Sequence, residues 1–166
     1  MSLNAPLIGE LQHEAATTRR MLERLPENEF DWKPHEKSMT LGQLATHIVE
    51  MLDWLPITLK QEELDFAAGN YQPTIVKTTA QLLELFDQKT MQAVEVLQSA
   101  TDEQFVQNWT LRNGADVFFK MPKIQVIRGM IMNHIVHHRG QLSVYMRLRD
   151  VPLPAMYGPS ADEKTF

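Results

Sequence analysis

Hydrophobic residues recur at intervals of three and four along four separate stretches of the chain. In an α helix this spacing places the side chains on one face, which is then buried against other helices. The stretches span residues 3–25, 41–68, 75–97 and 123–149. Four amphipathic helices of this length predict an all-α fold, namely a four-helix bundle.

Polar and cyclic residues mark the expected ends of these helices. Pro26 ends the first, and Thr40 with Gln43 has the spacing of a capping box that begins the second. Pro56 is expected to kink or divide the second helix, whose pattern then resumes to about residue 68. Residues 69–73 break the pattern and leave room for a long crossover connection to the third helix.

The segment before the last helix differs from the rest because it lacks a helical period. Asn113-Gly114 is a strong turn signal for a short hairpin, and hydrophobic residues flank it on both sides. We therefore expect a small hairpin-like insertion within residues 101–121. Residues from about 151 onward contain several prolines and are expected to form an irregular tail.

Composition narrows the class of protein. A chain of 166 residues is most simply one domain, here spanning residues 1–166, and 43% hydrophobic residues suit an ordinary globular protein. The net charge of −5 argues against a nucleic-acid partner, and no segment is long and apolar enough to span a membrane. The absence of cysteine excludes disulfides and a zinc–thiolate site, and it agrees with a cytoplasmic location.

The stretch NHIVHHRGQL contains three of the six histidines within five residues. His134 and His138 are four positions apart, so a helix brings their Cβ atoms to about 5–6 Å from one another. Apolar residues recur at helical intervals around them, so both imidazoles are expected to point toward the core. Burying two unpaired imidazoles is costly, which favours a shared metal ion over two isolated core histidines.

A third ligand is needed, and His47 is the candidate because it lies on the shoulder of the buried face of the second helix. His13 and His35 are expected at the surface or in a loop. His137 adjoins His138 and points about 100° away from it on a helix, so we do not expect it to be a ligand.

Three imidazoles leave one or more positions open on a divalent ion, as in catalytic rather than closed structural sites. Gln141 follows His138 on the same helix face, and we expect it to position a water molecule or a substrate there. A hydrolase triad built from Ser143 and Asp53 with a histidine is disfavoured, because no strained nucleophile turn is evident.

Two motifs, MTLGQLATHI around His47 and NHIVHHRGQL around His134 and His138, carry a resemblance to the DinB-like family of bacterial helical metalloproteins. FDWKPHEKSMT and WTLRNGADVFF fit the same family, so the resemblance covers roughly residues 7–149. It implies a bundle with a long crossover, often homodimeric. It also implies a divalent metal, usually nickel or zinc, held by the three histidines.

Relatives in that family include thiol-dependent enzymes, among them bacillithiol transferases and a mycothiol-dependent isomerase. The resemblance therefore implies S-transfer with a low-molecular-weight thiol. Two alternatives stay open: a metal-dependent hydrolase, with Glu14 or Glu50 as general base, and a non-catalytic dimeric bundle whose metal stabilises or senses. Arg139 points away from the ligand face, and we expect it to form a structural salt bridge or a dimer contact.

Overall fold

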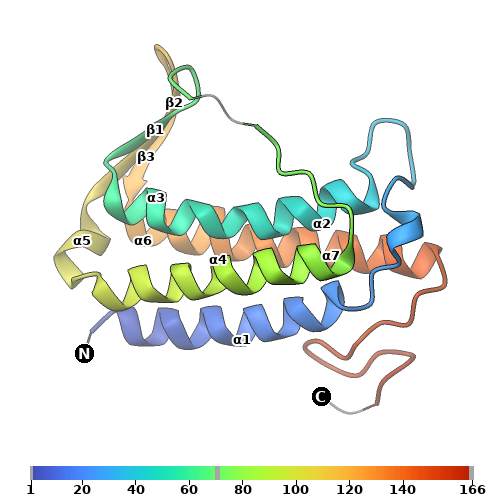
Figure 1. Cartoon of the computed structure of the whole chain (residues 1–166). Coiled ribbons are helices and arrows are strands. Elements are labelled where there is room, and N and C mark those ends of the chain that lie inside the picture. Colours follow the sequence, from blue (N-terminus) through green and yellow to red (C-terminus); the bar gives the residue numbers. More distant parts are fainter. Residues whose placement is uncertain (1, 70–71, 165–166) are drawn as a thin grey trace.

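Four helical rods lie side by side in the computed structural model, which describes residues 2–69 and 72–164 (Figure 1). In chain order the rods are α1 (Asn4–Leu22), α2 (Leu41–Glu50) continued by α3 (Trp54–Lys60), α4 (Thr79–Ser99), and a last rod that ends in α7 (Asn133–Leu148). Helix α1 packs on α4, and α2 packs on α7. The predicted helical bundle is present, but the all-α prediction is only partly right because a small sheet accompanies it.

The second rod begins with the predicted capping box. Thr40 Oγ1 accepts the Gln43 N–H, and the Gln43 side chain accepts the Thr40 N–H. The rod tightens into a 3₁₀ turn, η2 (Met51–Asp53), just before α3, in whose first turn Pro56 lies. A proline is tolerated there because its missing N–H would find no partner in a first turn. The expected division near Pro56 is therefore observed.

The second rod ends at Lys60, so the prediction that it continues to about residue 68 is wrong. Residues Glu63–Asp65 instead form strand β1, which pairs in parallel with β2 (Asn108–Asn113). Strand β2 pairs in antiparallel fashion with β3 (Asp116–Pro122), giving the predicted hairpin. Gly114 has a φ of 60° in its turn, a conformation that glycine adopts without a Cβ penalty.

Two shorter elements also depart from the expected pattern. The short helix α5 (Asp102–Val106) begins with a second capping box, formed by Thr101 and Gln104. The 3₁₀ turn η1 (Glu27–Glu29) follows Pro26.

Helix α4 starts at Thr79 rather than near Ile75, and Ile75 is 82% exposed. Its placement in the third helix was therefore wrong.

The last rod is not one uniform α helix. It runs through α6 (Lys123–Gln125) and a seven-residue π-helical segment, η3 (Val126–Met132), before α7 begins. A π segment rotates the residues that follow it relative to an α-helical continuation. The buried stripe along this rod consists of Ile127, Ile131, Ile135, Arg139, Leu142 and Met146.

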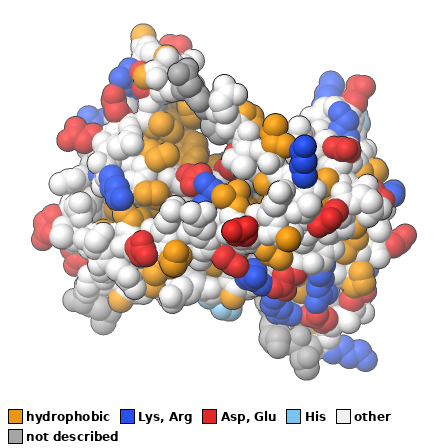
Figure 2. Space-filling model, viewed as in Figure 1, with side chains coloured by type: hydrophobic (Ala, Val, Ile, Leu, Met, Phe, Trp, Pro, Cys, Tyr) orange, Lys and Arg blue, Asp and Glu red, His pale blue; other side chains and the backbone are white. Residues whose placement is uncertain are grey.

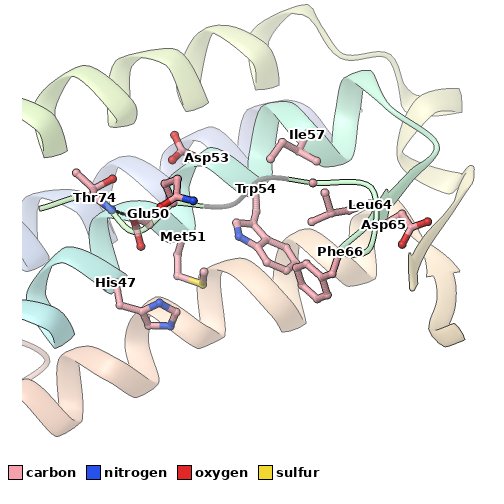
Figure 3. Close-up of a pocket in the computed structure, with 12 residues that line it drawn as sticks. His47, Glu50, Met51, Asp53, Trp54, Ile57, Leu64, Asp65, Phe66 and Thr74 are labelled. Carbon is pink, nitrogen blue, oxygen red and sulfur yellow. Dashed lines mark hydrogen bonds between the residues drawn. The ribbon is translucent and has the colours of Figure 1, made fainter. Parts of the chain in front are cut away.

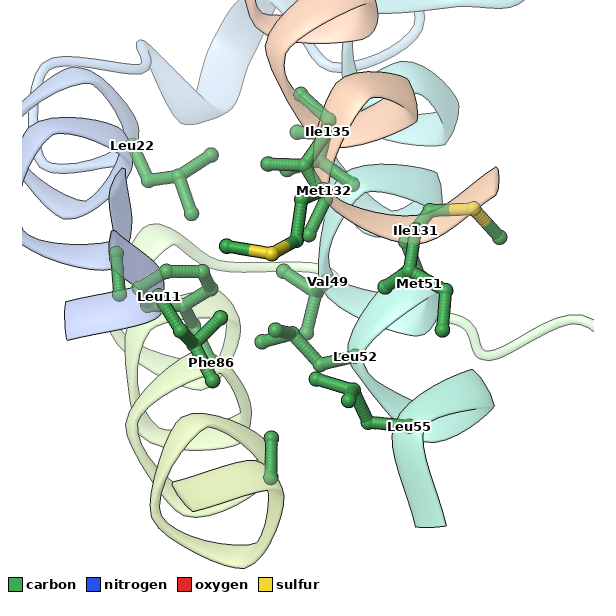
Figure 4. Close-up of a cluster of buried hydrophobic side chains, with 14 of the residues drawn as sticks. Leu11, Leu22, Val49, Met51, Leu52, Leu55, Phe86, Ile131, Met132 and Ile135 are labelled. Carbon is green, nitrogen blue, oxygen red and sulfur yellow. The ribbon is translucent and has the colours of Figure 1, made fainter. Parts of the chain in front are cut away.

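The hydrophobic core lies between the rods and draws on all of them (Figure 4). Leu11 and Leu22 come from α1, Phe86 from α4, and a set from the second and last rods includes Val49, Leu52, Leu55, Ile131, Met132 and Ile135. A second cluster, formed by Trp109, Leu111 and Val126, fills the space between the sheet and the last rod.

The tail is irregular, as expected, but it is tied to the bundle. Glu163 forms ion pairs with Arg20 of α1 and with Arg24 just after it, and Asp162 pairs with Arg147 at the end of α7. Ala155, which is part of the tail, is fully buried. Among the described residues, no helix combines the length and hydrophobicity needed to cross a membrane.

Candidate metal centre

Three histidines from two helices meet at one point. His47 comes from α2, and His134 and His138 come from successive turns of α7, the helix that packs on α2. One ring nitrogen from each lies within 4.8 Å of the other two. The ring centroid of His47 is 5.3 Å from that of His134 and 4.6 Å from that of His138. The three candidate ligands chosen from the sequence are thus brought together.

The histidines lie beside the buried stripe of the last rod rather than within it. All three side chains are half-buried, whereas Arg139, the neighbour of His138, occupies the stripe and is 1% exposed. The expectation that the imidazoles point into the core was therefore wrong. They form a layer at the edge of the core, where a bound ion can be reached from outside.

Two of the imidazoles are held by acceptors on their Nδ1 side. His134 Nδ1 lies 3.3 Å from the Met130 carbonyl oxygen, and His138 Nδ1 lies 2.7 Å from Gln141 Oε1. Because these oxygens accept hydrogen bonds, each ring keeps its proton on Nδ1 and has its lone pair on Nε2. A metal ligand needs this tautomer, and a partner behind the ring fixes its orientation.

Burial also favours the neutral form of the three rings. Desolvation is the main cause that lowers the pKa of His47, His134 and His138, and the nearby imidazoles add to it. The charge of Glu50 acts in the opposite direction on His47. Neutral imidazoles have a free lone pair, so their protonation state suits a metal ligand.

A cavity of about 450 Å³ opens from His47 along the second rod (Figure 3). Met51, Trp54 and Ile57 line one side, and Leu64 and Phe66 line the other. The remaining lining residues are polar or small: Glu50, Asp53, Asp65, Gly69, Gln72 and Thr74. The three-histidine cluster therefore adjoins a mostly apolar pocket through His47, and ligand sites are commonly pockets of this kind.

The sequence model that describes the DinB family matches residues 1–165 of this chain. The chain belongs to the DinB family. Two relatives from Bacillus subtilis (strain 168) are uncharacterized proteins: YjoA is 25% identical over 130 residues, covering 78% of this chain and 80% of YjoA. YrdA is 27% identical over 153 residues, covering 92% of this chain and 86% of YrdA.

Solved DinB-like structures share the fold. The crystal structure of YjoA matches with a TM-score of 0.72 at 20% identity, covering 96% of this chain and 99% of YjoA. A DinB-like protein from Bacillus cereus matches with a TM-score of 0.75 at 22% identity, covering 94% and 98% of the two chains. YfiT from Bacillus subtilis, described as a probable metal-dependent hydrolase with an unusual four-helix bundle topology, matches at 0.66 and 15% identity, covering 89% and 88%.

The other histidines of this DinB protein lie elsewhere. His13 and His35 are exposed, in α1 and in the loop before α2. His137 is exposed too; its ring centroid is 4.9 Å from that of His138, yet it is not part of the three-nitrogen cluster.

Gln141 has a different contact from the one expected. Its Oε1 atom is engaged with His138 Nδ1, so it acts on the back of a candidate ligand. Arg139 forms the predicted structural salt bridge, since its Nη2 lies 2.6 Å from Glu14 Oε2. Glu14 also accepts a hydrogen bond from the Tyr157 hydroxyl at 2.7 Å. Of the two carboxylates considered as bases, Glu50 is the one that lines the cavity with His47.

The aromatic residues of the cavity were missed at the sequence level. Trp54 follows His47 by seven positions, which is two helical turns, so their shared face was visible in the spacing. Phe66 could not have been found in the same way, because its position depends on strand β1.

Proposed function

We propose that this chain is a metal-dependent enzyme in which His47, His134 and His138 hold one divalent ion. The observation that carries the proposal is the convergence of three neutral imidazoles within 4.8 Å at the end of an apolar cavity. Three nitrogen ligands suit nickel or zinc and leave positions open for a substrate. When bound, such an ion supplies Lewis acidity that makes a thiol or a water molecule more acidic.

The reaction we propose is S-transfer from a low-molecular-weight thiol. The chain has no cysteine, so the sulfur nucleophile would come from a cosubstrate. In the reaction the thiol loses its proton to solvent and the sulfur forms a bond to a carbon of the electrophile. The bond from that carbon to the leaving group breaks, and the leaving group departs with the electron pair and takes up a proton from solvent. The protein's residues would orient the reactants: Gln141 holds His138 in place, and the apolar cavity beside His47 keeps water away from the electrophile.

Metal-dependent hydrolysis is the second candidate, and two observations favour it. The fold is shared with YfiT, which is described as a probable metal-dependent hydrolase. Glu50 lies one turn from His47 on the wall of the same cavity, and its Oε1 accepts the Thr74 N–H at 2.8 Å. In this version Glu50 would take a proton from the attacking water.

A screen with and without a thiol separates these candidates. The protein is loaded with nickel or zinc and incubated with a panel of electrophiles and esters, and products are detected by mass spectrometry. S-transfer predicts products that contain the thiol and that disappear after chelation and in His138→Ala, but persist in His137→Ala. Turnover without any thiol would support hydrolysis instead. No turnover across the panel, together with a higher melting temperature on metal binding, would assign the ion a structural role and overturn the enzyme proposal.

A further inference from the structure

We infer that the cavity beside the histidines binds an uncharged aromatic group of the substrate, which packs against Trp54 and Phe66. This inference rests on the proposed function for its catalytic meaning, because the reacting group would lie at the histidine end. The binding of the aromatic group, however, depends only on the cavity and is measured separately.

The cavity follows one face of the second rod. His47, Glu50, Trp54 and Ile57 recur at three- and four-residue steps and all line it (Figure 3). At a helical rise of 1.5 Å per residue, Trp54 is about 10 Å along the rod from His47. A substrate whose reacting atom lies near the histidines therefore extends along the rod toward Trp54. The part of the substrate that lies beside the indole has room for about one ring system.

Two aromatic side chains form the far part of the cavity. The ring centroids of Trp54 and Phe66 are 6.2 Å apart with an interplanar angle of 63°. Phe66 is 45% exposed, so a large apolar surface faces the cavity and solvent rather than the core. An edge-to-face pair of this kind offers a third ring both a face and an edge to pack on.

Both rings are fixed from behind. The indole of Trp54 packs on Trp109 with centroids 6.3 Å apart, and Phe66 packs on Phe118 at 6.2 Å. The Phe66 N–H donates to the Arg112 carbonyl at 3.0 Å, which extends the pairing of β1 with β2. The sheet thus holds Phe66 against Trp54, and a ligand would not have to order these side chains on binding.

The charges around the cavity disfavour an anion. Within the part of the chain that the structure describes, the acidic and basic residues that line it are Glu50, Asp53 and Asp65, together with His47. Lys89 pairs with Asp53 at 2.5 Å and Arg112 with Asp65 at 2.6 Å, but neither cation is part of the lining. Hydrophobic side chains dominate the hollow that is visible between the sheet and the helices (Figure 2). Apolar walls with carboxylates at the edge favour a neutral ring over a negatively charged one.

A pair of fluorescent probes tests the inference. N-phenylnaphthylamine is uncharged, and anilinonaphthalene sulfonate carries the same rings with a negative charge. Both are titrated into the full chain with and without bound zinc. We expect the neutral probe to bind more tightly than the sulfonate. We also expect Phe66→Ala to weaken binding of the neutral probe about fivefold, the scale of one aromatic contact.

Val117→Ala is the control. Val117 lies on the β2–β3 hairpin, is 58% exposed and does not line the cavity. Phe66→Leu serves as a second variant that keeps an apolar side chain, and circular dichroism checks that each variant is folded. Equal affinity in Phe66→Ala and Val117→Ala, or tighter binding of the sulfonate, would overturn the inference. Failure of the metal proposal would give a different result: the protein would hold no zinc, and the neutral probe would still bind the cavity.

Discussion

His138 donates its Nδ1 proton to the Oε1 atom of Gln141, which lies 2.7 Å away and one turn further along α7. This contact leaves the lone pair on Nε2 and holds the ring in the orientation in which one of its nitrogens lies within 4.8 Å of ring nitrogens of His47 and His134. Gln141 therefore acts on the site through His138. The sequence marked Gln141 as a candidate site residue, and the structure gives it the role of orienting a ligand.

Replacing Gln141 by alanine should weaken metal binding while leaving one ion per chain at saturation. The loss of a hydrogen-bond partner behind a ligand typically costs about 10-fold or more in affinity. A competition titration with a chromophoric chelator measures the change. Ser143→Ala is the control, since Ser143 lies on the same helix and its hydroxyl bonds to the Gly140 carbonyl. Identical zinc affinities in the two variants would refute the role assigned to Gln141.

Arg139 should be one of the most important residues for stability. It is 1% exposed and donates to the Glu14 carboxylate, to the Glu14 carbonyl and to the Thr18 hydroxyl. Arg139→Met leaves the Glu14 carboxylate, whose side chain is 14% exposed, without its cation. We expect the free energy of unfolding to fall by about 3 kcal/mol, the cost of breaking a buried pair from one side.

Chemical denaturation measures this difference, with Arg149→Met as its control. Arg149 pairs with Glu29 at 2.8 Å, but its side chain is 37% exposed, so solvent screens the pair. A similar loss of stability in both variants would contradict the special position of Arg139 in the core.

The stability contributed by Asp65 should depend on pH. Hydrogen bonds from the N–H groups of Gly114 and Ala67, together with the nearby Arg112 guanidinium, hold the pKa of Asp65 below its ordinary value. A carboxylate whose folded pKa is depressed stabilises the protein fully above its unfolded pKa, and this contribution disappears as the pH falls through the folded pKa.

Asp65→Asn should therefore lower the urea midpoint at neutral pH, and the difference from wild type should shrink below a pH of about 4. Asp116→Asn is the comparison, because Asp116 lies on the same hairpin with an exposed side chain. A difference between wild type and Asp65→Asn that stays constant down to acid pH would show that the ionised carboxylate is not the cause.

The helical part of the fold could be predicted because its signals are local. The faces of α1 and of the second rod follow from spacing alone, and Thr40 with Gln43 marks a helix start wherever it occurs. The hairpin was also readable, because Asn113-Gly114 specifies its turn. Strand β1 was not, since three residues pair in parallel with a strand more than forty positions away and carry no pattern of their own.

The site could be predicted only as a set of residues. The four-residue step places His134 and His138 together, but their position at the edge of the core depends on packing. The burial of Arg139 depends on partners in α1 and in the tail, Glu14 and Tyr157, which no local pattern connects to it. The π-helical segment before α7 could not be predicted either, because the spacing of hydrophobic residues does not distinguish it from an α helix.

The metal content of purified, tag-free protein tests the central claim most directly. Inductively coupled plasma mass spectrometry would be applied to the wild type, to His47→Ala, His134→Ala and His138→Ala, and to the control His137→Ala. We predict one equivalent of nickel or zinc per chain in the wild type and in His137→Ala, and a strong loss in each of the other three variants. Undiminished stoichiometric metal in all three ligand variants would contradict the proposed centre.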